Sequence, residues 1–367
     1  MKLLRLVLSD LHLSAGIRRG ELNPLEDFVH DDRFADLLRY YDELAGEKTE
    51  IELILNGDIF DLLKVKIDGT WPLEVTAHVA AEKLRKCLDG HPRFVRALRD
   101  FLAKDRRRLV YLPGNHDLDM WFTAPQELFR RYVAPGDKAG RVRFITDNDT
   151  YYLPEGIQIR HGHQLERIHR VDYSHMTRMT KEGVEVLNLP WGSIWILEVM
   201  NPAKELRNHI DRVQPFRRFL MGAMLFDTRF AIRFLVSSAL HFVRHRIFAI
   251  HVWKERLRNF TKVLREEIFS IGTYDESAMR ALQQLRGVHT LIVGHSHGPR
   301  YLALPQGKVL VNTGTWIRMI NVDLQHLGQN SGLTYAIIEY DDEGRPQTSL
   351  MRWYGRQVPC EAIPYAD

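Results

Sequence analysis

The chain has 367 residues, a net charge of +4, and 45% apolar and 27% charged residues. This is the composition of a folded protein with one large domain, or of a domain that carries a sizeable insertion. Its two cysteines, Cys87 and Cys360, exclude a framework of several disulfides, and neither belongs to a C-x-x-C pair. No export signal follows Met1, and charges interrupt every apolar run well before the ~20 residues that a membrane-spanning helix needs. We therefore expect a cytoplasmic protein.

Apolar runs of strand length and stretches of helical spacing divide the chain into elements. Strands are expected at 3–8, 51–56, 108–112, 290–293, 308–311, 334–340 and 348–354, with 141–153 and 156–160 as a further pair. Helices are expected at 32–44, 75–104 with a break at 90–92, 126–132 and 275–285. Strands alternate with helices at the start and pair with each other at the end, which indicates a layered α/β core.

Five short groups of polar residues each follow one of these strand-like runs. They are Asp10-Leu11-His12, Gly57-Asp58-Ile59-Phe60-Asp61, Gly114-Asn115-His116-Asp117, His161-Gly162-His163 and Gly294-His295-Ser296-His297. An aspartate at the carboxyl end of a buried strand is costly unless it is paired or bound to a metal. A single group of this kind is also explained by a loop aspartate that caps the next helix. Together, the five predict one ligand cluster at the rim of the sheet.

The order D-x-H, G-D-x-x-D, G-N-H-D, H-G and G-H-x-H resembles that of the calcineurin-like metallophosphoesterases, over roughly residues 1–165 and 285–330. The resemblance implies an α/β fold, a layered α/β/β/α sandwich. We expect its core at 1–165 and 275–367. Residues 166–274 show no strand pattern, so we expect a long, largely helical insertion there that forms a cap or lid.

The resemblance also implies two divalent metal ions. Asp10, His12 and His297 resemble the ligands of one ion, Asn115, His161 and His295 those of the other, and Asp58 resembles the carboxylate that bridges them. Phosphoester hydrolysis with hydroxide at neutral pH is typical of two cations ~3.5–4 Å apart. Mixed carboxylate, amide and imidazole ligands favour Mn, with Fe or Zn as alternatives. Taken singly, each histidine is also explained as a hydrogen-bonded polar residue.

Two further residues resemble catalytic groups of the family. His116 matches the histidine that contacts the phosphate and protonates the leaving group, and Asp61 matches the carboxylate that orients this imidazole. Asp61 would serve equally as a residue that stabilises its loop. We expect Asp117 to brace the loop, His163 to be either a neighbour of the ligands or a loop residue, and 312–316 to pack near the metals.

The predicted insertion carries most of the positive charge. Residues 204–258 hold 12 Lys and Arg against 4 Asp and Glu, so the rest of the chain is net negative. Between Phe216 and Trp253, aromatic and aliphatic residues at helical spacing interleave with arginines. One interpretation is a cap that packs on the core with its arginines in water. The other is an amphipathic surface that meets anionic lipid or an acyl chain, whereas aromatics among long aliphatics do not favour nucleic acid.

A basic, apolar, helical insertion between the H-G and G-H-x-H groups resembles the UDP-2,3-diacylglucosamine pyrophosphatases of lipid A biosynthesis. These are Mn-dependent peripheral membrane enzymes, which would place the chain on the inner face of the membrane. They commonly carry arginine at the position of His116, and H-G-D where this chain has His161-Gly162-His163. The leading hypothesis is a dinuclear metal hydrolase that cleaves a phosphodiester or pyrophosphate bond of such an amphipathic substrate.

Two alternatives remain open from the sequence. One is a soluble phosphodiesterase or phosphatase that acts on nucleotides or other phosphoesters, in which the insertion is only a lid. The other is a non-enzymatic adaptor on the same fold. Loss of metal ligands would mark the adaptor, and all seven candidate ligands are present in this chain.

Overall fold

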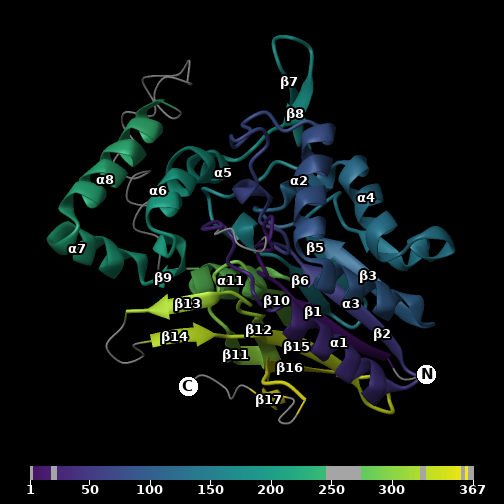
Figure 1. The fold of residues 1–367 in the computed structure, drawn as a ribbon. Coiled ribbons are helices and arrows are strands. Elements are labelled where there is room, and N and C mark those ends of the chain that lie inside the picture. Colours follow the sequence, from purple (N-terminus) through teal and green to yellow (C-terminus); the bar gives the residue numbers. More distant parts are fainter. Residues whose placement is uncertain (1–2, 18–22, 245–273, 323–327, 357–359, 363–367) are drawn as a thin grey trace.

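The computed structural model describes residues 3–17, 23–244, 274–322, 328–356 and 360–362. Two sheets form its centre (Figure 1). The larger has the strand order β17 (Cys360–Ala362), β16 (Pro346–Trp353), β15 (Thr334–Tyr340), β1 (Leu3–Leu8), β2 (Glu50–Asn56), β3 (Arg107–Leu112) and β4 (Val142–Phe144). The smaller has the order β11 (Arg300–Leu304), β12 (Lys308–Asn312), β10 (Thr290–Val293), β6 (Ile157–Arg160) and β5 (Thr150–Leu153).

Strands β1, β2 and β3 run parallel, and their side chains alternate between two apolar clusters. Leu6 lies opposite Leu53, and Leu53 opposite Leu109, and all three belong to the cluster beneath the helices. Val7 and Ile54 point the other way, into a cluster shared with the strands of the smaller sheet. Both faces of these strands are therefore buried, which explains why their sequences are nearly continuous apolar runs.

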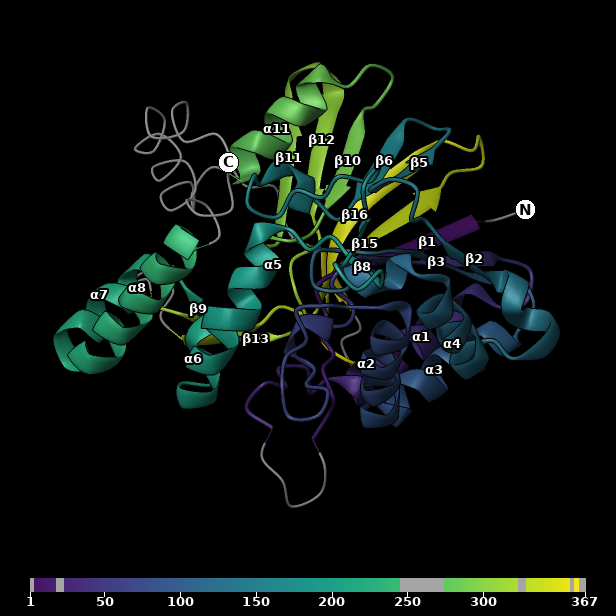
Figure 2. The same cartoon turned by 90° about the horizontal axis from the view of Figure 1, so that it is seen from above.

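Helices cover the outer face of each sheet (Figure 2). Helices α1 (Asp31–Ala45), α2 (Ala77–Gly90), α3 (Pro92–Ala103) and α4 (Thr123–Val133) lie on the larger sheet, and α11 (Tyr274–Gln284) packs on the smaller one. The predicted α/β/β/α sandwich is thus confirmed. The predicted break at 90–92 is also confirmed, because Pro92 begins α3 where its missing N–H costs nothing.

The prediction of one strand pair at 141–153 and 156–160 is wrong in part. Strand β4 pairs with β3 in the larger sheet, whereas β5 pairs with β6 in the smaller sheet. The chain crosses between the sheets at residues 145–149. Strands β4 and β5 are both strand-like in composition, so the pattern of residues along 141–153 did not show that they belong to different sheets.

The prediction of an insertion without strands is also wrong. Strands β7 (Thr177–Met179) and β8 (Glu185–Leu187) form a hairpin that projects from the molecule (Figure 1). Strand β9 (Val213–Gln214) pairs with β13 (Arg318–Asn321), which in turn pairs with β14 (Gly328–Ser331). Each of these strands has four residues or fewer, too few for an alternating pattern to show.

Within the described part of the insertion, residues 166–244, the α-helices are α5 (Trp191–Trp195), α6 (Asn201–Leu206), α7 (Phe216–Phe226) and α8 (Thr228–Phe242), with a π-helical stretch, η5 (Ile196–Met200), between the first two. We call residues 166–244 the cap segment; residues 245–273 of the predicted insertion lie outside the described residues. Phe230 and Phe234 of α8 pack with Ile196 and Met200 in a separate apolar cluster. This cluster also includes Leu63 of the core, so the cap segment is packed on the core.

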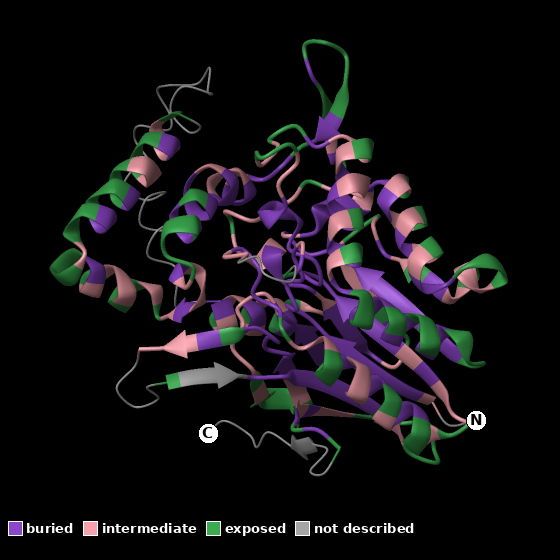
Figure 3. Ribbon diagram, viewed as in Figure 1, coloured by how far each residue is buried: buried purple, intermediate pink, exposed green. Residues whose placement is uncertain are grey.

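Short 3-10 helices complete the described secondary structure: η1 (Leu62–Lys64), η2 (Leu118–Trp121), η3 (Gly136–Arg141), η4 (His163–Leu165), η6 (Ile210–Arg212) and η8 (Pro305–Gly307). Helices α7 and α8 lie farthest from the sheets and are exposed along much of their length (Figure 3). Among the described helices, none combines the length and apolar character needed to cross a membrane.

Candidate metal centre

The seven candidate ligands lie at one rim of the two sheets. Asp10, Asp58 and Asn115 follow β1, β2 and β3, whose carboxyl ends point to the same edge. His161 and His295 follow β6 and β10, which are parallel neighbours in the smaller sheet. The backbone amide of His295 donates a hydrogen bond of 3.1 Å to Asp10 Oδ1, which joins the two sheets at this rim. Parallel packing therefore brings together residues as distant in the sequence as Asp10 and His295, which are 285 positions apart.

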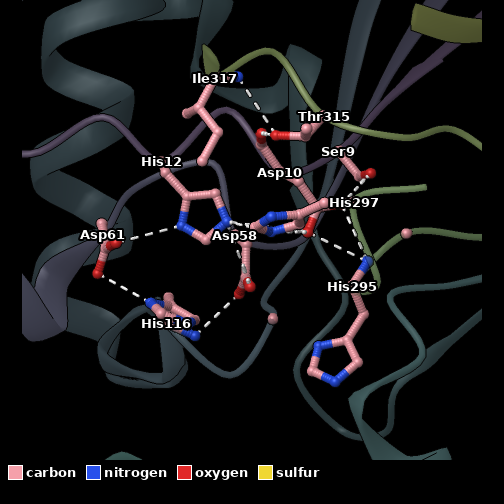
Figure 4. A network of polar contacts seen from close by, with 12 residues as sticks. Ser9, Asp10, His12, Asp58, Asp61, His116, His295, His297, Thr315 and Ile317 are labelled. Carbon is pink, nitrogen blue, oxygen red and sulfur yellow. Dashed lines mark hydrogen bonds and ion pairs between the residues drawn. The ribbon is translucent and has the colours of Figure 1, made fainter. Parts of the chain in front are cut away.

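Asp10, His12 and His297 form one group of converging side chains (Figure 4). His12 Nε2 lies 2.9 Å from His297 Nε2, and His297 Nε2 lies 3.4 Å from Asp10 Oδ1. The Asp58 Oδ2 atom is 3.9 Å from His12 Nε2. The carboxylate of Asp58 therefore reaches the edge of this group.

Asp58, His161 and His295 form a second group. Asp58 Oδ2 lies 3.1 Å from His161 Nε2, so the same carboxylate oxygen faces both groups. Asn115 Oδ1 is buried without a hydrogen-bond partner. The structure thus brings together the side chains of six of the seven residues predicted from the sequence, with Asp58 between the two sets, and Asn115 follows β3 at the same rim.

Each of three histidines is held by an oxygen atom on one ring nitrogen, and the other nitrogen faces the site. His12 Nδ1 donates to Asp61 Oδ2 at 3.2 Å, and His161 Nδ1 donates to the carbonyl oxygen of Asn56 at 2.9 Å. His295 Nε2 donates to Glu166 Oε2 at 3.0 Å. The remaining nitrogens, among them His161 Nε2 and His295 Nδ1, then face the site and can bind a cation when they carry no proton.

A ring nitrogen and a buried carboxylate oxygen approach closely only when a proton or a metal cation lies between them. His161 Nε2 faces Asp58 Oδ2 in this way. Histidine metal ligands usually donate the other ring N–H to an oxygen, which fixes the tautomer and the ring orientation. The residues at the rim therefore fit divalent cations.

Left-handed backbone conformations of residues other than glycine are concentrated at the rim. Nine described residues other than glycine have a left-handed φ, and five of them are candidate ligands: Asp10, His12, Asp58, His295 and His297, with φ from 52° to 70°. This conformation costs free energy for residues with a Cβ atom, and it persists where surrounding contacts impose it. The loops are held so that successive side chains turn into the site.

Glycine is required at two positions because other groups approach too closely. Gly57 has a φ of +79°, and a Cβ atom there would lie 2.5 Å from the ring of His161. At Gly294, a Cβ atom would overlap the carboxylate of Asp10. The glycines of these motifs therefore allow the ligands to converge.

His116 lies beside the two groups with its ring oriented by Asp61. His116 Nδ1 lies 2.9 Å from Asp61 Oδ1, and its side chain is 17% exposed whereas that of Asp61 is 0% exposed. Burial lowers the pKa of His116, but the carboxylates of Asp61 and Asp58 raise it to about 9. The imidazolium form is thus favoured at neutral pH, which suits a proton donor.

Neighbouring charges also shift the pKa values of the candidate ligands. Burial would raise the pKa of Asp58, but His161 and His116 hold it well below its usual range. Burial lowers the pKa of His161, whereas Asp58 and Asp10 raise it to about 10. A cation that binds His161 Nε2 must therefore displace a proton, so metal affinity falls as pH falls.

Asp117 braces the loop, as predicted. Its carboxylate accepts hydrogen bonds from the backbone amides of Gly114 at 2.5 Å and Ile59 at 3.0 Å, and from the hydroxyl of Tyr111 at 2.5 Å. The 312–316 turn also lies beside the site, because Thr315 Oγ1 donates to the carbonyl oxygen of Asp10 at 2.6 Å.

Glu166 and His169 lie at the site but were not predicted from the sequence. Glu166 accepts from His295, and these two residues form a third cluster of potential ligands with His169. His163 is fully buried, and neither of its ring nitrogens has a hydrogen-bond partner. The available signal for Glu166 was its position five residues after His161, in the loop that follows β6.

The model of the calcineurin-like phosphoesterase family matches residues 4–215. This is more than half of the chain, and the chain belongs to that family. The match extends through the first part of the predicted insertion and ends before Gly294. The family is one of phosphoesterases, and the groups of potential ligands at the rim are consistent with the two metal ions typical of it. No curated protein matches the chain in sequence.

Several solved structures align with the chain at low similarity. A dimetal phosphatase from Danio rerio is 12% identical with a TM-score of 0.39, and the alignment covers 99% of each chain. A putative 5'-nucleotidase from Staphylococcus aureus in complex with alpha-ketoglutarate is 13% identical, with a TM-score of 0.33. A 5'-nucleotidase precursor from Thermus thermophilus is 12% identical, with a TM-score of 0.35. The alignments cover 100% of this chain but 55% of each nucleotidase, so the chain spans about half of their length.

Proposed function

We propose that the rim is the active site of a dinuclear metal hydrolase that cleaves a phosphodiester or pyrophosphate bond. The observation that carries this proposal is the position of Asp58. One buried carboxylate oxygen faces His12 Nε2 at 3.9 Å on one side and His161 Nε2 at 3.1 Å on the other. When bound, two divalent ions, Mn by preference and Fe or Zn as alternatives, supply Lewis-acid charge to the phosphoryl group and lower the pKa of water.

The proposed roles follow the two groups of side chains. Asp10, His12 and His297 hold one ion, Asn115, His161 and His295 hold the other, and Asp58 contacts both. Asp61 keeps the proton of His12 on Nδ1, so that Nε2 faces the site. His116 is outside both ligand sets and donates a proton to the leaving oxygen, while Asp61 holds its ring through Nδ1.

We propose an amphipathic substrate such as UDP-2,3-diacylglucosamine, because of the surface formed by α7 and α8. Eight exposed apolar residues, which we call the α7–α8 surface, are Met221, Met224, Leu225, Phe226, Ile232, Leu235, Val236 and Leu240. Phe226 is 91% exposed. The exposed arginines Arg217, Arg218, Arg229 and Arg233 lie on the same two helices.

This combination supports contact with the anionic inner face of a membrane. Large exposed apolar patches mark binding surfaces, and arginine side chains attract anionic headgroups. In this proposal the core is 1–165 and 275–367, and residues 166–274 form the cap. Part of the predicted amphipathic stretch, residues 245–258, lies outside the described residues.

Two measurements test the proposal. Elemental analysis should find two divalent ions per chain; chelation should abolish hydrolysis, and Mn²⁺ should restore it. Hydrolysis of UDP-2,3-diacylglucosamine should exceed that of a soluble dinucleotide in kcat/KM by ~10²-fold or more, since each buried CH₂ of an acyl chain contributes ~0.8 kcal/mol. Full turnover by metal-free protein contradicts the mechanism. Equal turnover of both substrates contradicts the lipid substrate and favours a soluble phosphodiesterase with a lid.

A further inference from the structure

Six charged side chains form a buried network between the core and the cap segment. It consists of three carboxylates and three cations, so it is neutral as a whole: Asp27, Asp61 and Asp211 with Lys64, Lys204 and Arg212. The Lys204 side chain is 0% exposed, and the Asp211 side chain is 19% exposed. Buried charges are costly unless they are paired and hydrogen-bonded. Each member of the network has at least one oppositely charged partner.

Lys64 lies at the centre of the network. Its Nζ atom is 2.6 Å from Asp27 Oδ2, 2.9 Å from Asp61 Oδ2 and 2.8 Å from Asp211 Oδ2. Three donors of one ammonium group thus meet three carboxylates. Burial would lower the pKa of Lys64, but Asp211, Asp27 and Asp61 raise it well above its usual range. The side chain is therefore charged at neutral pH.

The cap segment supplies half of the network. Lys204 of α6 donates to Asp27 Oδ1 at 2.9 Å and to Asp211 Oδ1 at 2.5 Å. Arg212 Nε lies 3.2 Å from Asp27 Oδ1. A further hydrogen bond, 2.8 Å from Asn201 Nδ2 to the carbonyl oxygen of Leu63, joins the same helix to η1. The cap segment thus holds the turn that carries Lys64.

Asp61 connects this network to the rim. Its Oδ2 atom lies 2.9 Å from Lys64 Nζ and 3.2 Å from His12 Nδ1. Its Oδ1 atom lies 2.9 Å from His116 Nδ1. Because Lys64 and His12 share Oδ2, the carboxylate can turn only slightly, and Oδ1 remains directed at His116.

We propose that Lys64, held by Asp211 of the cap segment, is a positioning residue for Asp61 and through it for His116. Docking of the cap segment then completes the proton-donating part of the site. This inference rests on the proposed role of His116. It assigns the cap segment a function in the chemical step that is separate from substrate binding.

Aryl methyl phosphodiesters that differ only in the phenol provide the test. A proton donor matters for a basic leaving group such as phenolate and little for p-nitrophenolate. We expect Lys64→Met to lower kcat for the phenyl ester by ~10–100-fold, as for other partners that orient a catalytic group. For the p-nitrophenyl ester we expect a change below ~3-fold. Asp211→Asn, which keeps the shape of the side chain, should show the same pattern at ~10-fold.

The decisive measurement is a double-mutant cycle. If Lys64 acts through His116, Lys64→Met should have no further effect on the phenyl ester in a His116→Ala background. Arg107→Met is the matched control: Arg107 is also a buried cation, 2.7 Å from Asp42, but it lies at the opposite end of β3 from the rim. It should change thermal stability without changing the ratio of the two esters.

The outcomes separate this inference from the proposed function. Equal losses on both esters, or additive losses in the cycle, overturn the positioning role. If Lys64→Met does not fold, as judged by circular dichroism, the pattern with Asp211→Asn decides. Failure of the proposed function is different: His116→Ala itself would then leave the ratio of the two esters unchanged.

Discussion

The rim of the two sheets and the α7–α8 surface both depart from the usual distribution of residues in a folded protein, the rim by burying polar side chains and the α7–α8 surface by exposing apolar ones. At the rim, carboxylates and imidazoles are buried: Asp10 and His161 are 0% exposed. On the α7–α8 surface, apolar side chains are in water: Leu225 is 75% exposed. Both arrangements cost free energy in the isolated chain. The difference indicates what each region binds. Cations would compensate the buried carboxylates and imidazoles of the rim, and an apolar phase would remove the side chains of the α7–α8 surface from water.

The two regions also differ in how strongly the fold determines them. Each of three rim histidines has a fixed hydrogen-bond acceptor, and five ligands have a left-handed backbone imposed by their loops. The α7–α8 surface has no comparable set of contacts among the described residues, since its side chains point outward. We therefore expect substitutions at the rim to have much larger effects than substitutions on α7 and α8.

The largest expected effect follows from Asp58→Ala. It removes the carboxylate between the two groups and should lower the metal content below two ions per chain. Loss of several kcal/mol of charge stabilisation corresponds to a decrease in kcat of ~10³-fold or more. Elemental analysis and steady-state kinetics measure both. The control is Asp42→Asn, a buried carboxylate paired with Arg107 away from the rim, and normal metal content in Asp58→Ala would contradict the bridging role.

His116→Ala should have the next largest effect. Since this side chain is outside the ligand sets, both ions should stay bound while kcat for a substrate with a basic leaving group falls by ~10²–10⁴-fold. The measurement pairs kinetics with elemental analysis of the same preparation. Loss of metal together with activity would show that His116 is a ligand instead.

Glu166→Ala should weaken metal binding by ~10–100-fold, because this carboxylate orients His295 through Nε2. Calorimetric titration of metal-free protein with Mn²⁺ measures the affinity directly. Glu166→Gln keeps an oxygen acceptor for the same ring nitrogen and should lose less. If both variants bind Mn²⁺ like the unmodified protein, Glu166 has no role in holding the ligand.

The smallest effect is expected on the α7–α8 surface. Phe226→Ser should weaken binding to vesicles of anionic lipid at low salt by ~10-fold, from partial burial of one aromatic side chain. Co-sedimentation measures binding, and hydrolysis of a water-soluble diester should stay unchanged. Leu44→Ser, at a leucine that is 66% exposed on α1, is the control and should bind like the unmodified chain. Vesicle binding that does not distinguish the two variants would remove the membrane role from this surface.

Much of the core could be predicted because its signals are local. Strand β1 has the bounds expected from its apolar run, and helix α1 begins and ends within one residue of the expected range. The seven candidate ligands were named from the resemblance of the five motifs to those of the family. Their gathering at one rim was expected because each group follows a strand, and the carboxyl ends of parallel strands meet at one edge. The matching family model agrees with the class of enzyme that these motifs predicted.

Other features depend on contacts between distant residues and have no local signal. The division of residues 141–153 between two sheets, the short strands β7, β8 and β9, and the acceptor role of Glu166 all belong to this class.

The amino-acid sequence by itself determined where the groups of carboxylates and imidazoles stand along the chain, each after a strand, because side-chain type and strand periodicity are properties of short segments. Only the tertiary structure decided how they are held. Lys64 and Asp211 are 147 positions apart and form one ion pair in a buried network, and their pairing depends on how the cap segment packs on the core. The burial and the ion-pair partners of a charged side chain are set only when the chain folds. These two properties decide whether the side chain stays in water or positions another residue.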